Sequence, residues 1–105
     1  MDKTDALKIA MQYADVIKDS FDCKRIILFG SYAKGNFNED SDIDVAVVFT
    51  DYANRVDRQF ELMKLTRKVD SRIKPHPFRE NEFELSNPVV NEIIKYGQEI
   101  SHLII

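Results

Sequence analysis

Two aspartates separated by one residue are the part of this sequence best suited to chemistry. Asp42 and Asp44 begin the segment Asp42–Phe49, whose later residues are all apolar, so we predict a strand with an exposed first end. Side chains two apart on a strand point to the same face, so the two carboxylates share one patch. Their repulsion is relieved by a hard divalent cation such as Mg²⁺, which binds carboxylate and phosphate oxygens together. The pair therefore predicts a metal site for phosphate chemistry.

A glycine and a serine upstream of the aspartates offer a place for phosphate groups. Arg25–Phe29 predicts a strand covered on both faces, Gly30 ends it, and one helical turn is expected near Ser31 to Lys34. Gly30 permits close backbone approach, the Ser31 hydroxyl can bond a phosphate oxygen, and amides of a helical turn attract an anion. Taken singly, the glycine and serine also suit an ordinary capped turn, and an acidic pair also suits a loop.

The two motifs together match a known signature. Gly30-Ser31-Tyr32-Ala33-Lys34-Gly35 followed by Ser41-Asp42-Ile43-Asp44-Val45 resembles the signature of the DNA polymerase beta-like nucleotidyltransferase superfamily. In length and element order nearly the whole chain is similar to the minimal nucleotidyltransferases, called MNT proteins. That resemblance implies an α/β (α+β) fold, in which helices flank a small mixed β-sheet with the polymerase beta-like nucleotidyltransferase core.

The resemblance also implies site residues and a reaction. Asp42 and Asp44 are expected to be catalytic and to hold Mg²⁺, while Gly30, Ser31, Ser41 and Lys34 are expected to bind the nucleotide. The reaction would move a nucleotide, with AMP from ATP as the expected case, to a hydroxyl group and release pyrophosphate. MNT proteins typically act as the antitoxin of a helical HEPN-type toxin, and some adenylylate a tyrosine on it. We therefore expect a HEPN-type partner to supply the acceptor.

One part of the family pattern is missing. Active members normally add a third carboxylate from a later strand, but the segment Arg72–Phe78 contains no acid and carries Lys74 and His76 instead. Lys74 would weaken metal binding or contact a phosphate, and His76 could act as a neutral base or be merely structural. The alternative function is therefore a catalytically weak or inactive module that neutralises its partner by masking it. An enzyme acting alone on a small molecule would need a second pocket.

Composition limits the remaining possibilities. The chain has 105 residues, 44% of them apolar and 31% charged, which favours one globular domain over residues 1–105. The net charge of -3 argues against extensive nucleic-acid binding, and the longest apolar runs are too short to cross a membrane. A single cysteine, Cys23, and an N-terminus unlike a signal peptide favour a cytoplasmic location. The apolar C-terminal end favours a homodimer or a hetero-oligomer.

The other expected elements position these motifs. Residues Thr4 to Ser20 predict an amphipathic helix capped by Thr4, and residues Asn54 to Val69 predict another, whose apolar face packs on the sheet. That face is marked by Val56, Phe60, Leu62, Met63, Leu65 and Val69. Ser71–Phe78 predicts a short strand, although Pro75 and Pro77 suit only a sheet edge or an irregular segment. A last helix should begin at Asn87-Pro88 and end at Gly97, followed by a tail, Gln98–Ile105, that forms a strand or docks on a partner.

Overall fold

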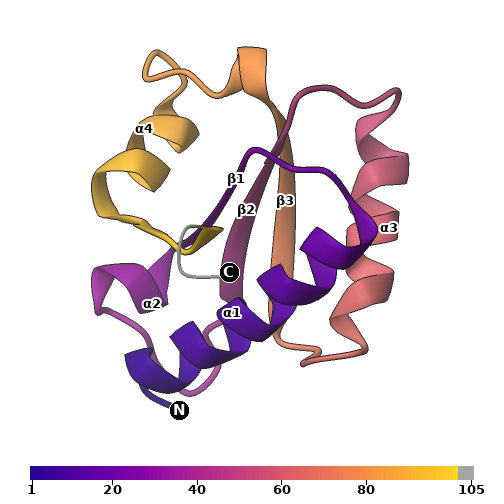
Figure 1. Cartoon of the computed structure of the whole chain (residues 1–105). Coiled ribbons are helices and arrows are strands. Elements are labelled where there is room, and N and C mark those ends of the chain that lie inside the picture. Colours follow the sequence, from indigo (N-terminus) through magenta and orange to yellow (C-terminus); the bar gives the residue numbers. More distant parts are fainter. Residues whose placement is uncertain (102–105) are drawn as a thin grey trace.

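The computed structural model describes residues 1–101 and contains one four-stranded sheet with the strand order β3-β2-β1-β4 (Figure 1). The elements in chain order are α1 (Lys3–Ser20), β1 (Arg25–Phe29), α2 (Ser31–Lys34), β2 (Ile43–Phe49), α3 (Arg55–Thr66), β3 (Ile73–Arg79), η1 (Glu80–Glu82), α4 (Pro88–Tyr96) and β4 (Gln98–Glu99). The expected α+β class with a small mixed sheet is confirmed. Residues 102–105, on which the predicted end of the tail falls, lie outside the described residues.

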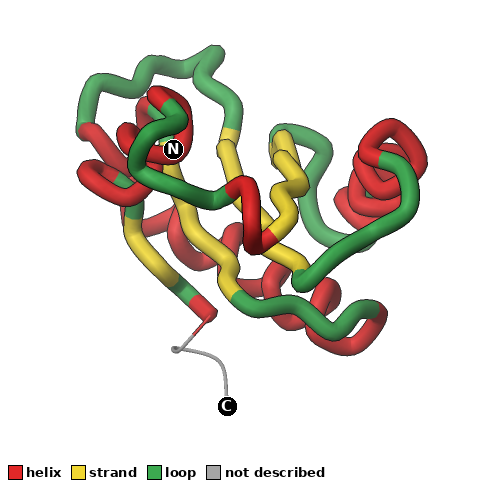
Figure 2. Tube along the Cα trace, turned by 90° about the horizontal axis from the view of Figure 1, so that it is seen from above, coloured by secondary structure: helices red, strands yellow, loops and turns green. Residues whose placement is uncertain are grey.

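The sheet is mixed because β2 pairs differently with its two neighbours. It runs antiparallel to β1 and parallel to β3. Alternate residues of β2 enter two apolar clusters: Val45 and Val47 pack with α1 and Leu62 of α3, whereas Ala46 and Val48 pack with α4. Figures 1 and 2 accordingly show α3 and α4 on opposite sides of the strands. Helices on both faces explain why the strand is apolar without alternation.

Helix α1 begins earlier than the sequence suggested, and Thr4 is not its cap. The Asp2 side chain accepts a hydrogen bond from the Asp5 amide, and the Asp5 side chain accepts one from the Asp2 amide. This reciprocal arrangement satisfies two amides at once, which a threonine placed inside the first turn cannot do. Ala6, Ala10 and Ala14 then repeat every fourth residue and lie fully buried against the sheet.

A buried tyrosine links α1 to α3. The Tyr13 hydroxyl donates a hydrogen bond to the Leu62 carbonyl over 2.6 Å, and burial raises the pKa of this hydroxyl. We expect Tyr13→Phe to lower the free energy of unfolding by about 1 kcal/mol, because it removes one buried hydrogen bond while keeping the ring. Urea denaturation measures the change. Tyr96→Phe, at a residue that is 47% exposed, is the matched control, and equal losses for both variants would contradict this role for Tyr13.

Strand β3 is an edge strand, as its prolines predicted. Pro75 and Pro77 lack the amide hydrogens that a further strand would need. The carbonyl of Pro75 accepts a hydrogen bond from the Gln59 side chain over 2.7 Å, and that of Pro77 accepts one from the Tyr52 hydroxyl over 3.4 Å. The outer edge is therefore closed, and His76 is held between two residues of restricted backbone conformation.

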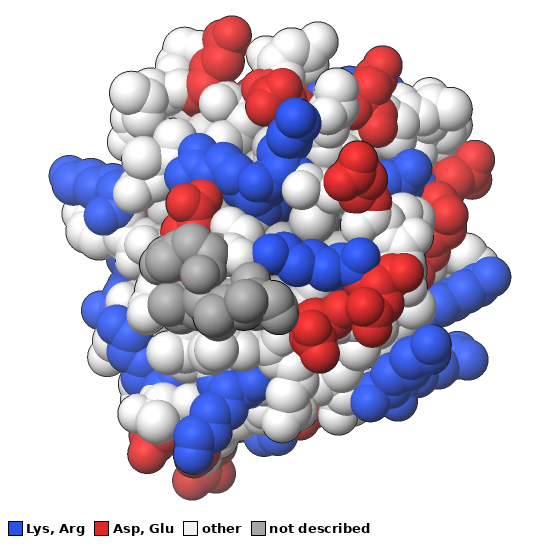
Figure 3. All heavy atoms as spheres, viewed as in Figure 1, with Lys and Arg blue, Asp and Glu red and all other residues white. Residues whose placement is uncertain are grey.

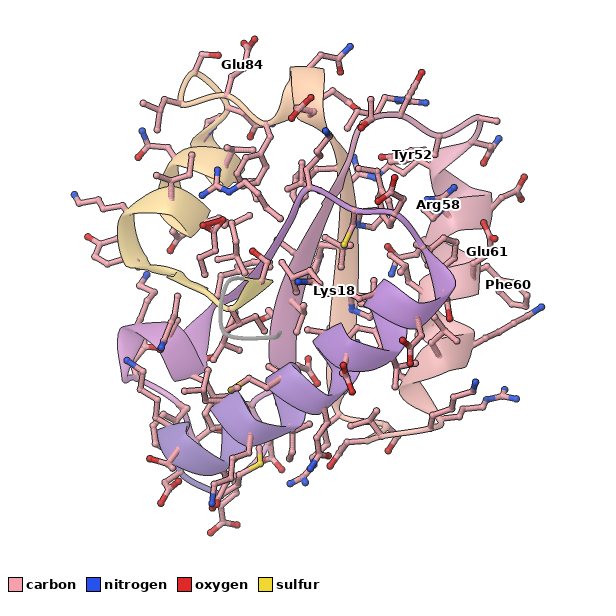
Figure 4. All side chains as sticks on the ribbon, in the orientation of Figure 1. Lys18, Tyr52, Arg58, Phe60, Glu61 and Glu84 are labelled. Carbon is pink, nitrogen blue, oxygen red and sulfur yellow. The ribbon has the colours of Figure 1, made fainter. Side chains whose placement is uncertain are left out.

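Helix α3 does not pack with the expected face. Val56, Phe60 and Met63 were predicted to contact the sheet, but they are 75%, 62% and 44% exposed. The helix instead buries Leu62 and Thr66, and it ends at Thr66 rather than Val69. On this other side the Arg58 guanidinium lies over the aromatic rings of Phe21, Phe49 and Tyr52. Figure 4 shows Arg58 beside Tyr52. Arginine replaces an aliphatic contact there because its planar group stacks on rings, which the apolar period does not reveal.

Helix α4 has the ends that the sequence predicted. The Asn87 side chain accepts hydrogen bonds from the Val89 and Val90 amides, Pro88 occupies the first turn, and Gly97 ends the helix. A Cβ atom on Gly97 would lie 2.3 Å from the Ile93 carbonyl oxygen, so only glycine fits at this close turn into β4.

The surface in Figure 3 mixes basic and acidic side chains over the visible face. This pattern agrees with the small net charge of -3. Among residues 1–101, no helix combines the length and apolar character that a membrane span requires.

Candidate active site

The two aspartates lie at the first end of β2. Asp44 is the second residue of β2 and shares its face with Ala46 and Val48, which α4 covers. Asp42 immediately precedes the strand. The Asp42 side chain is 50% exposed and the Asp44 side chain 24%, so both carboxylates are within reach of a ligand. Each carboxylate contacts a side chain of β3: Asp42 that of Lys74 and Asp44 that of His76.

Gly30 lies directly against Asp44. The antiparallel register places Phe29 opposite Asp44, and Gly30 follows with a φ of +77°. A Cβ atom at Gly30 would be 2.3 Å from Oδ2 of Asp44. Glycine is therefore required twice, for its left-handed backbone and for the space that the carboxylate occupies. The Gly30-Ser31 motif and the aspartate motif are separated in the sequence but lie next to each other in the fold.

The turn after Gly30 presents backbone amides at this place. Helix α2 is a single turn in which Lys34 donates its amide to the Gly30 carbonyl and Gly35 donates to that of Ser31. The first amides of such a turn have no acceptor within it and can bind an anion. Tyr32 is buried and stacks on Phe37 at 4.7 Å, so it anchors the turn.

Ser41 and Lys34 have structural partners. The Ser41 hydroxyl accepts a hydrogen bond from the Asn38 amide at 2.9 Å, which shapes the loop before Asp42. The Lys34 ammonium donates to the Glu92 carboxylate over 2.6 Å and lies 5.1 Å from the Tyr96 ring centroid. The hydrogen bond from Lys34 to Glu92 raises the pKa of Lys34. Lys34 thus ties α2 to α4, a contact between distant residues that no local sequence signal could indicate.

Lys74 and His76 occupy the place expected for a third carboxylate, and each of their side chains contacts one aspartate. Lys74 is in register with Asp44, and its ammonium nitrogen lies 3.9 Å from Oδ2 of Asp42. His76 Nε2 is 3.0 Å from Oδ1 of Asp44, and its ring packs edge-on against Phe29 with the centroids 5.0 Å apart. Both acids are therefore paired with strand β3. The sequence did not identify Phe29 as a neighbour of the site, because its pattern indicates only a strand residue. In the structure Phe29 packs against the ring of His76.

The donor set limits how a divalent cation could be held. Within the described part of the chain, His, Cys, Asp and Glu side chains form no group of three or more suited to a metal ion. The protein side therefore offers the carboxylates of Asp42 and Asp44. That set fits Mg²⁺, which commonly uses one or two carboxylates and completes its octahedral shell with water and substrate phosphates.

Comparisons with known proteins show the family of this chain. Residues 10–99 match the family model of the nucleotidyltransferase domain. The chain is 31% identical over 88 residues to a protein of Methanocaldococcus jannaschii named as a protein adenylyltransferase, with 81% of this chain and 84% of the relative covered.

Two solved structures are similar in fold. A protein of Sulfolobus solfataricus named as a nucleotidyltransferase has a TM-score of 0.65 and 25% identity, covering 76% of this chain and 72% of that one. A mutant form of the toxin-antitoxin MntA-HpeT has a TM-score of 0.61 and 25% identity, covering 84% and 68%. Because the family model spans both motifs of the site, the chain belongs to the nucleotidyltransferase domain family, as its resemblance to the minimal nucleotidyltransferases predicted.

Proposed function

We propose that this nucleotidyltransferase moves AMP from ATP to a hydroxyl group of a partner protein, with Mg²⁺ held by Asp42 and Asp44. The observation that carries the proposal is the contact between Gly30 and Asp44, where an added Cβ would lie 2.3 Å from the carboxylate oxygen. This contact places the Gly30-Ser31 turn, which we propose binds phosphate, next to the carboxylate of Asp44. A triphosphate bound there would contact both, as nucleotidyl transfer requires.

Each residue of the site has a distinct part in this proposal. The Gly30-Ser31 turn binds phosphate oxygens through its backbone amides and the Ser31 hydroxyl. Asp42 and Asp44 hold the cation, which would offset charge on the phosphate oxygens and orient the donor for in-line attack. Ser41 shapes the loop that carries Asp42, and Lys34 fixes the turn through Glu92. Attack by the acceptor hydroxyl on the α-phosphorus forms a phosphodiester and releases pyrophosphate.

A partner protein is the proposed acceptor. The solved MntA-HpeT structure is a toxin-antitoxin, and the Methanocaldococcus relative is named for transfer to protein. The site itself lies open beside α4, with Asp42 half exposed, and a macromolecule can reach such a position. We therefore propose an antitoxin role in which a HEPN-type helical toxin receives the nucleotide and is inactivated.

Intact mass spectrometry tests this function. The chain is purified with the protein that it retains and is incubated with ATP and Mg²⁺, and parallel samples contain a chelator or another nucleoside triphosphate. We expect the retained protein to gain the mass of AMP, and the chelator to prevent the gain. A retained protein whose mass never changes under any of these conditions would exclude the transferase proposal.

Neutralisation by masking is the second candidate, and one observation favours it. Lys74 places a positive charge 3.9 Å from Asp42, which opposes cation binding. A masking protein would bind its partner equally well after Asp42→Ala and Asp44→Ala, whereas a transferase would lose neutralisation. Growth of cells that express the partner with wild type or the double variant separates the two functions.

The charge of Lys74 gives a further prediction. Lys74→Gln should strengthen Mg²⁺ binding roughly fivefold, because it removes one exposed like charge about 4 Å from a ligand carboxylate. Titration calorimetry with Mg²⁺ measures the change. Lys24→Gln controls for the change in net charge. Lys24 is exposed and lies just before β1, at the end of that strand away from Gly30. An equal effect of both variants would show that Lys74 has no local role at the site.

A further inference from the structure

An apolar stripe on the outer side of α3 lies uncovered within residues 1–101. Val56, Phe60 and Met63 form this α3 stripe, and Phe60 points away from the sheet in Figure 4. A groove of about 510 Å³ lies beside it. The residues that line the groove are Phe60, Met63, Lys64, Thr66, Arg67 and Ser71. Apolar side chains this exposed and contiguous are typical of a protein interface.

The charges beside the α3 stripe are arranged with opposite polarity at its two ends. Asp57 and Lys64 are seven residues apart, almost two turns, so they lie on one flank of the helix on either side of Phe60. Figure 3 shows acidic side chains near the upper end of α3 and basic ones near its lower end. Glu61 is paired with Arg58 at 3.4 Å. In the part of the chain that the structure describes, Asp57 and Lys64 form no ion pair.

This polarity makes the surface complementary to itself. When two α3 helices pack antiparallel around a two-fold axis near Phe60, the flank of one meets the same flank of the other in reverse order. Asp57 then faces Lys64 of the second copy, and the pair occurs twice. In a parallel two-fold arrangement each flank would instead meet the opposite flank of the second copy, so Asp57 and Lys64 could not pair with each other. The apolar residues of the two helices meet between the ion pairs, as in the core of a helix interface.

We propose that the α3 stripe is the surface through which two copies of this chain form an antiparallel dimer. The proposal is independent of the proposed reaction. Asp44 lies on the opposite face of the sheet, beside α4, so the candidate active site stays open in both copies.

Sedimentation equilibrium over a range of concentrations tests the apolar part of the proposal. Wild type should be a dimer, and Phe60→Asp should weaken association by roughly 30-fold or more, because it places a charge at the centre of the interface. Leu85→Asp is the matched control, since Leu85 is 61% exposed and Phe60 62%, but Leu85 lies outside α3. Circular dichroism verifies the fold of each variant. A monomeric wild type, or a dimer equally sensitive to both changes, would overturn the proposal.

Charge exchange tests the antiparallel arrangement separately. Asp57→Lys places a basic residue opposite Lys64 of the second copy, and Lys64→Glu places an acidic residue opposite Asp57, so each variant alone should associate roughly tenfold more weakly than wild type. An equimolar mixture should regain association, because both ion pairs form again across the two different chains. Folded variants that remain dimeric alone, or a mixture that associates no better than either variant, would overturn the antiparallel interface.

Discussion

Asp44→Asn is expected to lower the rate of nucleotidyl transfer about a thousandfold. The amide has nearly the shape of the carboxylate but lacks the charge that holds a cation against the donor phosphates. Asp44 is the carboxylate that touches both Gly30 and His76, so the site has no equivalent substitute nearby. Initial rates of AMP transfer from ATP measure the effect.

The neighbouring loop provides a matched control for this change. Asp40 is exposed and lies two residues before Asp42. Asp40→Asn removes the same charge from the same region and should leave the rate within about twofold of wild type. Thermal unfolding should show that both variants are folded. A similar fall in rate for the two would assign the effect to general electrostatics, and an active Asp44→Asn would exclude a catalytic role for this carboxylate.

Gly30→Ala is expected to lower the rate of transfer about a hundredfold by moving Asp44. The new Cβ would lie 2.3 Å from Oδ2 of Asp44, and the residue would also keep an unfavourable φ of +77°. The carboxylate must turn away or the strand end must shift, and an error of about 1 Å in a catalytic group can cost about a hundredfold in rate. The transfer rate and the affinity for Mg²⁺ should both fall.

Gly35→Ala separates the two causes. Gly35 has a φ of +85°, but a Cβ atom there would meet nothing within 4 Å. Backbone strain should cost about 1 kcal/mol of stability at Gly35, which is in the left-handed helical region, and about 1 to 3 kcal/mol at Gly30, whose ψ of -153° suits glycine alone. Only Gly30→Ala should lose activity. If Gly35→Ala is equally inactive, the rigidity of the turn matters and the space beside Asp44 does not.

The elements that carry the site were predictable because local patterns define them. The apolar run of β1, the single turn after Gly30 and the aspartates at the start of β2 are local features, and each lies where the sequence indicated. Asn87, Pro88 and Gly97 likewise determine the ends of α4 through capping chemistry. Such features depend on neighbouring residues alone.

Long-range contacts explain where the predictions were wrong or incomplete. The sequence of α3 has apolar residues on two sides of the helix. The side that includes Leu62 packs on the sheet, where Arg58 also stacks on aromatic rings. The ion pair between Lys34 and Glu92 joins residues 58 apart, and the contact between His76 and Asp44 joins residues 32 apart. The absence of a third acid was evident from the sequence. That Lys74 and His76 would each face one aspartate depends on the parallel register of β2 and β3.

Transfer of label from ATP to the retained partner protein tests the central claim most directly. Parallel reactions use ATP labelled at its α-phosphate and ATP labelled at its γ-phosphate, with wild type and with the Asp42→Ala/Asp44→Ala double variant. Nucleotidyl transfer predicts that the partner acquires the α-label alone, and only from wild type in the presence of a divalent cation. Incorporation of the γ-label, or equal incorporation of the α-label by the double variant, would contradict the assignment of this site.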